Sequence, residues 1–208
     1  MSLVGTTIGH IRFESLLGMG GMGEVYRAFD EKLQRVVAVK TIRAEHRLSG
    51  TARARFLREA RILSRLANPL ICQVYDLIES DEADLLVLEF VDGETLDQLR
   101  SDRKLAEREV LEVGARIAEA LTVAHREHII HRDLKPGNLF VAKLPDGSLS
   151  LKIVDFGISK HIGGAARHHA STTTTSTVLG SPYYMPPEQM RAEPVDERSD
   201  IWSLGAIL

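Results

Sequence analysis

The stretch "IIHRDLKPGNLF", residues 129–140, decides the fold because it gathers a carboxylate, an ammonium group and an amide in one short loop. Asp133 can accept a proton from a hydroxyl nucleophile, and Lys135 can lie beside a phosphoryl group in transfer. Asn138 offers an oxygen ligand of the kind that Mg²⁺ prefers. The stretch predicts a phosphoryl-transfer centre in a loop between a helix and a strand.

Immediately downstream, "KIVDFGISK" places Asp155 just after the next strand and adds a second oxygen ligand for Mg²⁺. We expect short strands at 139–143 and 149–155, joined by a turn at "PDGS". Residues 159–187 read as a long loop that contains the low-complexity tract "ASTTTTST".

Upstream of the loop the pattern is helical. The segment 107–127 carries an apolar stripe with helical spacing. Its members are Val110, Val113, Ile117, Leu121 and Ala124. Before it, 10–18, 23–29, 35–42, 70–79 and 84–91 read as strands, and 51–66 reads as a helix. Five strands and one helix would make a small, mostly antiparallel lobe.

Glycines are concentrated in "LLGMGGMGEVYRA", residues 16–28, which contains Gly18-x-Gly20-x-x-Gly23. The spacing alone is weak evidence, since dinucleotide-binding folds also use it, but there a helix follows the last glycine. Here a strand follows, and no Gly-Lys-Ser/Thr of a Walker-type loop is present. We therefore expect the tip of a β-hairpin whose bare backbone approaches phosphate oxygens.

Lys40 ends the strand "VAVK", and Glu59 lies on the same helix face as Phe56, Leu63 and Leu66. A carboxylate on an inward-facing apolar stripe requires a cation. We expect Lys40 and Glu59 to pair and to direct the ammonium group at phosphate oxygens.

Composition narrows the class of protein and its compartment. The chain has 208 residues, a net charge of −3 and a pI of about 6.2, which does not favour nucleic-acid binding. Cys72 is the one cysteine, so a reducing, cytoplasmic compartment is expected, with Cys72 as a small core residue. The sequence contains neither a signal-peptide pattern nor an apolar run long enough to span a membrane.

At these residues the chain resembles the serine/threonine protein kinases, and "GMGGMGEVYRA" resembles their bacterial members in particular. The matching motifs follow in the family's order. They are the glycine-rich loop, "VAVK", the helix glutamate, "HRDLKPGN", "DFG", "GSPYYMPPE" and "DERSDIWSLG". The resemblance covers about residues 8–208.

The resemblance implies an α+β, bilobal kinase-like fold. Residues 1–90 would be the small antiparallel β lobe with its helix, and 91–208 a mainly helical, incomplete C-lobe. It also implies transfer of the γ-phosphoryl group of MgATP to serine and threonine hydroxyls of proteins, including the chain itself. ATP and Mg²⁺ would be the cofactors, and neither nucleic acid nor a membrane would be a partner.

Carried over position by position, the family's roles fall on these residues. Asp133 would be the catalytic base, with Lys135, Lys40 and Glu59 completing the catalytic set. The nucleotide contacts would be Gly18, Gly20, Gly23, Val25, Ala38, Lys40, Leu88 as gatekeeper, Glu89 and Val91 at the hinge, and Phe140. Asn138 and Asp155 would bind Mg²⁺, and Leu63, Val74, His131 and Phe156 would form an apolar column.

Regulation would involve Arg132, which in the family pairs with a phosphate on the activation loop. Thr173 and Thr175 are the expected autophosphorylation sites, and the alternative is a polar tract in which no single hydroxyl matters. His168 and His169 read as a surface pair rather than as metal ligands.

The chain departs from the family at three places. Ser181 stands where threonine is usual and keeps the hydroxyl that can bridge Asp133 and Lys135, while Pro186-Pro187 should only stiffen the loop. The sequence ends at Leu208, inside the expected helix "IWSLGAIL". Two interpretations stay open: an active kinase or the larger part of one, and a truncated nucleotide-binding or scaffold fragment of weak or no activity.

Overall fold

The computed structural model describes the chain except for residues 1, 21–22, 44–59, 80–82, 145–148 and 157–181. The chain divides into two compact units. The first consists of Met1–Arg65 and Gln73–Val91, and the second of Leu66–Cys72 and Asp92–Leu208.

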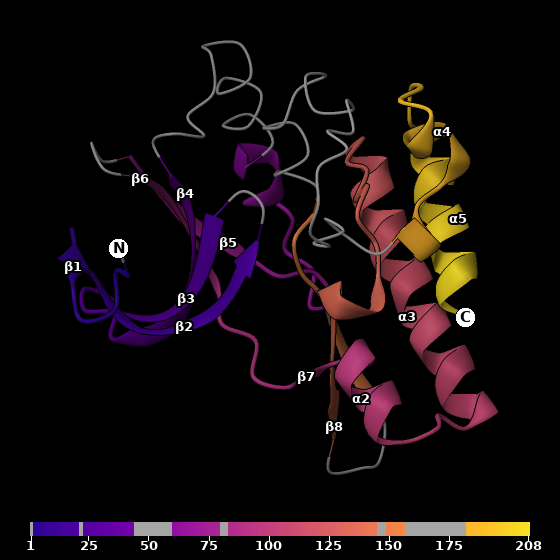
Figure 1. Cartoon of the computed structure of the whole chain (residues 1–208), viewed down its shortest axis with the longest axis horizontal. Helices are drawn as coiled ribbons and strands as arrows, with labels where there is room; N and C mark the ends of the chain where they lie inside the picture. Colours follow the sequence, from indigo (N-terminus) through magenta and orange to yellow (C-terminus); the bar gives the residue numbers. More distant parts are fainter. Residues whose placement is uncertain (1, 21–22, 44–59, 80–82, 145–148, 157–181) are drawn as a thin grey trace, which may run out of the picture. The chain divides into compact units, whose positions relative to one another are not determined.

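The first unit is built on a six-stranded antiparallel sheet that curls along its length (Figure 1). In spatial order its strands are β1 (Thr7–Ile8), β2 (Ile11–Gly20), β3 (Gly23–Asp30), β4 (Arg35–Arg43), β6 (Ala83–Glu89) and β5 (Val74–Glu79). Every neighbouring pair is antiparallel. The antiparallel sheet expected from the strand patterns is therefore confirmed, whereas most of the helix expected at 51–66 lies outside the described residues.

One face of this sheet carries the core of the unit. Four strands each contribute two residues at a spacing of two, which is the period at which side chains return to the same face of a strand. The buried set is Ile11, Phe13, Tyr26, Ala28, Val37, Val39, Leu85 and Val87. Residues at the alternating positions lie on the opposite face of the sheet, where they can contact a ligand.

β2 and β3 form the expected hairpin around the glycines. Their pairing runs from Ile11 opposite Asp30 to Gly20 opposite Gly23, and residues 21–22 at the tip lie outside the described part. A strand, and not a helix, follows Gly23. This excludes the dinucleotide-binding interpretation, which needs a helix N-terminus at that point.

The sheet differs from the expectation at both edges. β1 is a short additional strand beside the start of β2. β5 begins at Val74 rather than at residue 70, because the Asn68 side chain accepts a hydrogen bond from the Leu70 amide (2.8 Å) and turns the chain. Residues Leu66–Cys72 belong to the second unit, because Ile71 and Cys72 pair with Ile153 of that unit.

The second unit is mainly helical among its described residues. Its helices are α2 (Leu96–Asp102), α3 (Glu107–Arg126), α4 (Pro187–Met190) and α5 (Glu197–Ile207), with 3₁₀ turns η2 (Pro136–Asn138) and η3 (Pro182–Tyr184). The expected stripe on α3 is confirmed, since Val113, Ile117, Leu121 and Ala124 are buried and Val110 is partly buried. Pro187 does more than stiffen a loop: it occupies the first turn of α4, where proline's fixed φ favours a helix.

A small sheet accompanies these helices, in the order β7 (Glu94–Thr95), β8 (Leu139–Lys143) and β9 (Leu149–Ile153). Ile71 adds a parallel bridge to Ile153, with Cys72 N donating to Ile153 O (2.9 Å). The buried Cys72 is thus part of the packing of the second unit. β8 follows directly after the loop that contains the predicted catalytic residues, and β9 ends two residues before Asp155.

Helices α3 and α5 lie side by side in the second unit (Figure 1). Gly114 on α3 faces the Leu208 side chain, and a Cβ added there would come within 3.0 Å of it. At the opposite end of the helix pair, His125 near the end of α3 lies 2.8 Å from Asp200 in the first turn of α5, and this turn holds the loop of the candidate site.

Candidate active site

A single buried carboxylate fixes the backbone of the loop at its start. Asp200, in the first turn of α5, is 1% exposed. Its Oδ2 accepts a hydrogen bond from the His131 amide (2.8 Å), and its Oδ1 accepts one from the Arg132 amide (2.9 Å). The His125 ring on α3 lies 2.8 Å from the same Oδ2. Charge-assisted bonds to main-chain amides are among the strongest that a carboxylate makes, so residues 131–132 are held rigidly.

Two of the predicted functional residues have left-handed backbone, one in this loop and one just after β9. Arg132 has a φ of 63° and Asp155 a φ of 61°. For residues other than glycine this conformation costs free energy and persists only where the surroundings impose it, as they commonly do at functional sites. At Arg132 the imposing contact is the bond from its amide to Asp200.

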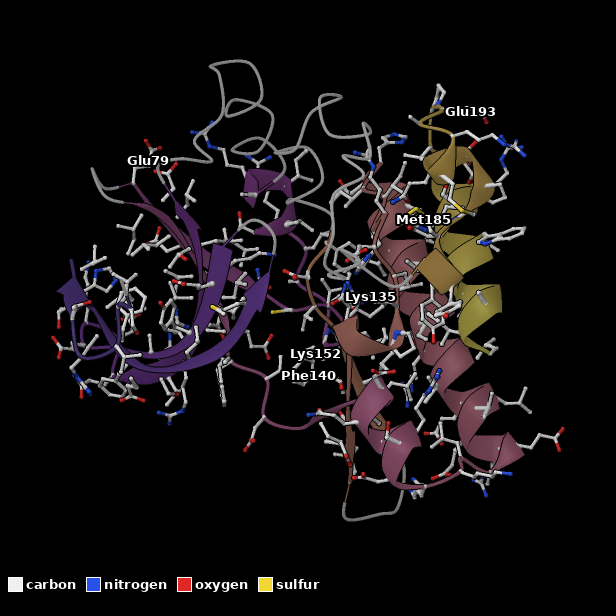
Figure 2. All side chains as sticks on the ribbon, viewed as in Figure 1. Glu79, Lys135, Phe140, Lys152, Met185 and Glu193 are labelled. Carbon is white, nitrogen blue, oxygen red and sulfur yellow. The ribbon has the colours of Figure 1, made fainter. Side chains whose placement is uncertain are left out.

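The three predicted residues of the loop come together around the carboxylate of Asp133. Lys135 Nζ lies 2.8 Å from Asp133 Oδ2. Asn138 Nδ2 donates to Asp133 O (2.8 Å) and to Oδ2 (3.2 Å). The turn η2 makes this possible because the Asn138 amide donates to Lys135 O (2.9 Å) and folds the chain back. Figure 2 labels Lys135 beside this turn.

Asn138 is oriented by those bonds. Since its amide nitrogen faces Asp133, its carbonyl oxygen is the atom of the side chain that a hard cation could use. The Asn138 main-chain oxygen accepts from the Val154 amide (3.0 Å), and Val154 immediately precedes Asp155. The two predicted Mg²⁺ ligands therefore lie on segments that hydrogen-bond to each other, and both are of the oxygen type that Mg²⁺ prefers.

His131 links the same two segments as a neutral ring. Its Nδ1 accepts from the Asp133 amide (3.2 Å), which leaves Nε2 to donate to Val154 O (3.1 Å). Complete burial lowers the pKa of His131, although Asp200 and the Val154 carbonyl act in the opposite direction. Its ring packs on Phe156 with 4.6 Å between centroids. The part of the expected apolar column that falls within this unit is thus in contact.

Phe140, the predicted nucleotide contact in this unit, lies on β8 opposite Lys152 on β9 (Figure 2). Phe140 comes two residues after Asn138, and its pairing with Lys152 fixes its position at the end of the catalytic loop. The predicted residues of the second unit therefore form one hydrogen-bonded neighbourhood on consecutive segments.

In the first unit the structure brings the predicted nucleotide contacts onto one face of the sheet. Val25 is opposite Lys40, and Ala38 is opposite Leu88. Ala38 and Lys40 are two apart on β4, so all four side chains lie on the face away from the buried core. Gly18 is opposite Val25 on the neighbouring strand, which leaves bare backbone beside that face.

Glu89 and Val91 follow at the end of this unit. The Glu89 amide donates to Gln73 O (2.9 Å), and the Glu89 carboxylate accepts from the Gln73 amide (3.1 Å). These two hydrogen bonds fix the direction in which the chain leaves β6. Val91 is the last residue of the unit.

Four predicted residues lie outside the described part of the chain. They are Glu59, Thr173, Thr175 and Ser181. The expected pairing of Lys40 with Glu59 and the phosphorylation sites therefore stay predictions, as does the surface assignment of His168 and His169.

Sequence reasoning missed the anchors of the site. It included Asp200 and Ser199 only as members of the motif "DERSDIWSLG", and it assigned nothing to His125. The Ser199 hydroxyl donates to Glu188 Oε1 (2.5 Å) and lowers the pKa of Glu188, so α5 also holds α4. The one usable signal was the polar pair Ser199-Asp200 directly before an apolar helical run.

Within the described part of the chain, no group of three or more His, Cys, Asp or Glu side chains is arranged to hold a metal ion. A cation at Asn138 and Asp155 would thus need phosphate oxygens or water as its other ligands, which is how Mg²⁺ commonly binds with nucleotides. No described helix is long and apolar enough to cross a membrane.

The fold and the loop define a class of protein, a protein kinase domain, and the comparisons with known proteins agree. The family model "Protein kinase domain" matches residues 11–208. The crystal structure of the PknI kinase domain from Mycobacterium tuberculosis superposes with a TM-score of 0.73 at 28% identity, covering 98% of this chain and 74% of that one. A point mutant of the same domain superposes with a TM-score of 0.76. The chain belongs to the protein kinase family.

Within the family, the similar curated proteins are bacterial serine/threonine kinases. The chain is 40% identical over 205 residues to the probable serine/threonine-protein kinase SCO3848 of Streptomyces coelicolor, covering 96% of this chain and 29% of the relative. It is 40% identical over 212 residues to PknB of Mycolicibacterium smegmatis, covering 98% and 33%. The chain thus spans about a third of the length of these relatives. The bilobal α+β kinase fold expected from the sequence is confirmed.

Proposed function

We propose that this chain is the catalytic part of a serine/threonine protein kinase, which transfers the γ-phosphoryl group of ATP to protein hydroxyls. The observation that carries the proposal is the carboxylate of Asp133, held by Lys135 and Asn138 in a loop that Asp200 fixes. The similarity to serine/threonine kinases supports the choice of acceptor. The lobes would correspond to residues 1–90 and 91–208.

In the proposed reaction the acceptor oxygen forms a bond to the γ-phosphorus, and the bond from that phosphorus to the bridging oxygen breaks to release ADP. Asp133 accepts the proton of the attacking hydroxyl. Lys135, 2.8 Å from Asp133, neutralises charge that develops on the transferred group. A positioned carboxylate beside an ammonium group is suited to this step because phosphoryl transfer demands mainly placement and charge neutralisation.

Binding of the nucleotide would involve the two units separately. In the first, Val25 and Ala38 offer an apolar surface to adenine, Leu88 is the gatekeeper, and Lys40 on the same face offers charge to the phosphates. In the second, Asn138 and Asp155 would hold Mg²⁺, which when bound neutralises phosphate oxygens. Bare backbone at Gly18, Gly20 and Gly23 would approach those oxygens.

Regulation and location belong to the same proposal. Arg132 would pair with a phosphate at Thr173 or Thr175, placed there by the chain itself. Other proteins with exposed serine or threonine would be substrates, and the kinase domain would work in the cytoplasm. The net charge of −3 gives no support to a nucleic-acid partner.

The test is intact-mass spectrometry of residues 1–208 after incubation with ATP, Mg²⁺ and a serine- and threonine-rich acceptor protein. Mass increments of phosphate on the chain or the acceptor are expected for the parent, and none for Asp155→Ala or Asp133→Asn. A folded parent that binds MgADP but transfers no phosphate to either protein would overturn the proposal. That result would support the scaffold interpretation.

A further inference from the structure

The ladder between β3 and β4 ends in an unusual way. Main-chain pairing stops at Val25 opposite Lys40, so the next position would bring Glu24 opposite Thr41. At this position the Thr41 hydroxyl replaces the main-chain hydrogen bonds of the ladder. The Glu24 amide donates to Thr41 Oγ1 (3.2 Å), and the same Oγ1 donates to Glu24 O (3.2 Å). Both residues are buried, so one hydroxyl satisfies both main-chain groups of Glu24 away from water.

The side chain of Glu24 is held from another direction. The Tyr26 hydroxyl donates to Glu24 Oε2 (2.6 Å). Tyr26 is fully buried, and its ring meets Phe13 edge-on with 5.2 Å between centroids. Burial first, and then the Glu24 carboxylate, raise the pKa of Tyr26, so the phenol stays protonated and remains a donor. The Leu3 amide in turn donates to the Tyr26 oxygen (3.3 Å).

The strands also approach each other closely at this point. A Cβ on Gly23 would collide with the Thr41 carbonyl oxygen, so only glycine fits there. Glu24 directly follows the last glycine of the loop, and Thr41 directly follows Lys40. The hydroxyl therefore joins the two backbone segments to which the proposed function assigns the phosphates.

We infer that Thr41 is a positioning residue for the phosphates of the nucleotide, acting through a clamp formed by Glu24, Tyr26 and Thr41. The clamp sets the spacing between the end of the glycine-rich hairpin and Lys40. This inference rests on the proposed function and deepens it. Neither Thr41 nor Tyr26 would touch the nucleotide, since Tyr26 lies on the core face of the sheet and Thr41, two residues after Val39 on β4, is on the same face.

If the Thr41 hydroxyl had a purely structural role, a different result would be expected. If Thr41 only satisfied a strand end, its removal would weaken the binding of all ligands alike or merely lower the melting temperature. A positioning role weakens the binding of phosphates while adenosine binding stays unchanged. The ratio of the dissociation constants for adenosine and MgADP separates the two, because it isolates the affinity that the phosphates contribute.

The experiment measures both constants by titration calorimetry for the parent chain, Thr41→Val and Thr41→Ser. Thr41→Val keeps the shape and removes the hydroxyl, whereas Thr41→Ser keeps the hydroxyl. We expect the dissociation constant for MgADP to rise roughly five- to tenfold in Thr41→Val, from the loss of two hydrogen bonds, with the adenosine constant unchanged. Thr41→Ser should retain the ratio of the parent.

A Thr41→Val chain with the ratio of the parent would overturn the inference alone, as would a Thr41→Ser chain as impaired as Thr41→Val. A parent chain that binds MgADP no more tightly than adenosine would overturn the proposed phosphate site, and this inference with it.

Tyr26→Phe provides the second variant should Thr41→Val fail to melt cooperatively. It releases the Glu24 side chain and keeps the ring against Phe13, so the ratio should fall by roughly threefold. Tyr75→Phe, on β5 of the same unit and partly exposed, is the matched control and should keep the ratio of the parent. Equal ratios in Tyr26→Phe and Tyr75→Phe would overturn the inference.

Discussion

In the second unit a charged carboxylate holds the catalytic loop, whereas in the first unit a neutral hydroxyl holds the end of the glycine-rich hairpin. Asp200 accepts from two amides at 2.8 and 2.9 Å, while Thr41 bonds to Glu24 at 3.2 Å in both directions. Charge-assisted bonds are shorter and roughly twice as strong as neutral ones. The difference indicates a loop that is held rigidly and a hairpin that is held with less free energy.

That contrast suits the proposed chemistry. A catalytic base must keep its place throughout the reaction, because a small displacement costs a large factor in rate. A loop over phosphates must instead open to admit the nucleotide and to release ADP. The main chain just before Asp133 is therefore held by a carboxylate, and the main chain of Glu24 beside the glycines by a weaker, neutral hydroxyl.

The largest effect should come from breaking the stronger anchor. In Asp200→Ala the amides of His131 and Arg132 lose their acceptor in a buried site. A buried donor left without an acceptor costs about 1–3 kcal/mol, so the two amides together should cost about 2–6 kcal/mol in the free energy of unfolding. Urea unfolding of parent and variant measures the loss.

Asp196→Ala is the matched control, because Asp196 is the exposed N-cap of the same helix. It should cost clearly less than Asp200→Ala. If the two variants lost equal stability, Asp200 would contribute no more to stability than the helix N-cap Asp196 does.

The next effect should appear at Gly23. An alanine there would press its Cβ against the Thr41 carbonyl and force β3 and β4 apart, at a cost of about 1–3 kcal/mol. Gly18→Ala offers a control on the same hairpin, since a Cβ at Gly18 meets nothing within 4 Å. Thermal unfolding of both variants without ligand tests this, and equal melting temperatures would contradict the crowding at Gly23.

A smaller effect is expected at Ser203. Its buried hydroxyl donates to Tyr184 O (2.7 Å) and thereby ties η3 to α5. Ser203→Ala leaves that carbonyl without this donor, which should cost about 1 kcal/mol. The unfolding free energy measures it, and a neutral result would mean that water replaces the hydroxyl.

Much of this arrangement could be predicted from the sequence, and the reasons are local. The strand at 35–42 and the stripe on α3 repeat at the periods of a strand and a helix, so their buried faces follow directly. The loop 131–138 could be assigned because its residue types and order match a family. Its Asp133, Lys135 and Asn138 are close in sequence and meet within one turn.

The anchors could not be predicted because their partners are distant in the chain. Arg132 and Asp200 are 68 residues apart, and Glu24 and Thr41 are 17 apart. Periodicity carries no information on such pairs, and a threonine in a β-branched strand looks like an ordinary strand residue. The departure of Leu66–Cys72 from the first unit likewise depends on its pairing with Ile153, far along the chain.

The smallest expected effect is the pH dependence of stability that His131 gives to the second unit. Burial lowers the pKa of His131 below its ordinary value of 6.5. The unfolded chain therefore binds a proton near pH 6.5 that the folded chain does not, and stability falls as the pH drops through that value. The folded ring stays neutral, and its Nδ1 keeps accepting from the Asp133 amide.

His131→Phe retains an aromatic ring against Phe156 and removes the titration. Unfolding free energies measured at about pH 7.5 and about pH 5.5 should therefore differ more in the parent than in the variant. An equal pH dependence in both chains would mean that the carboxylates around the loop, and not His131, set its response to acid. A protonated Nδ1 cannot accept the hydrogen bond from the Asp133 amide, so protonation of His131 in acid should accompany the loss of the native loop.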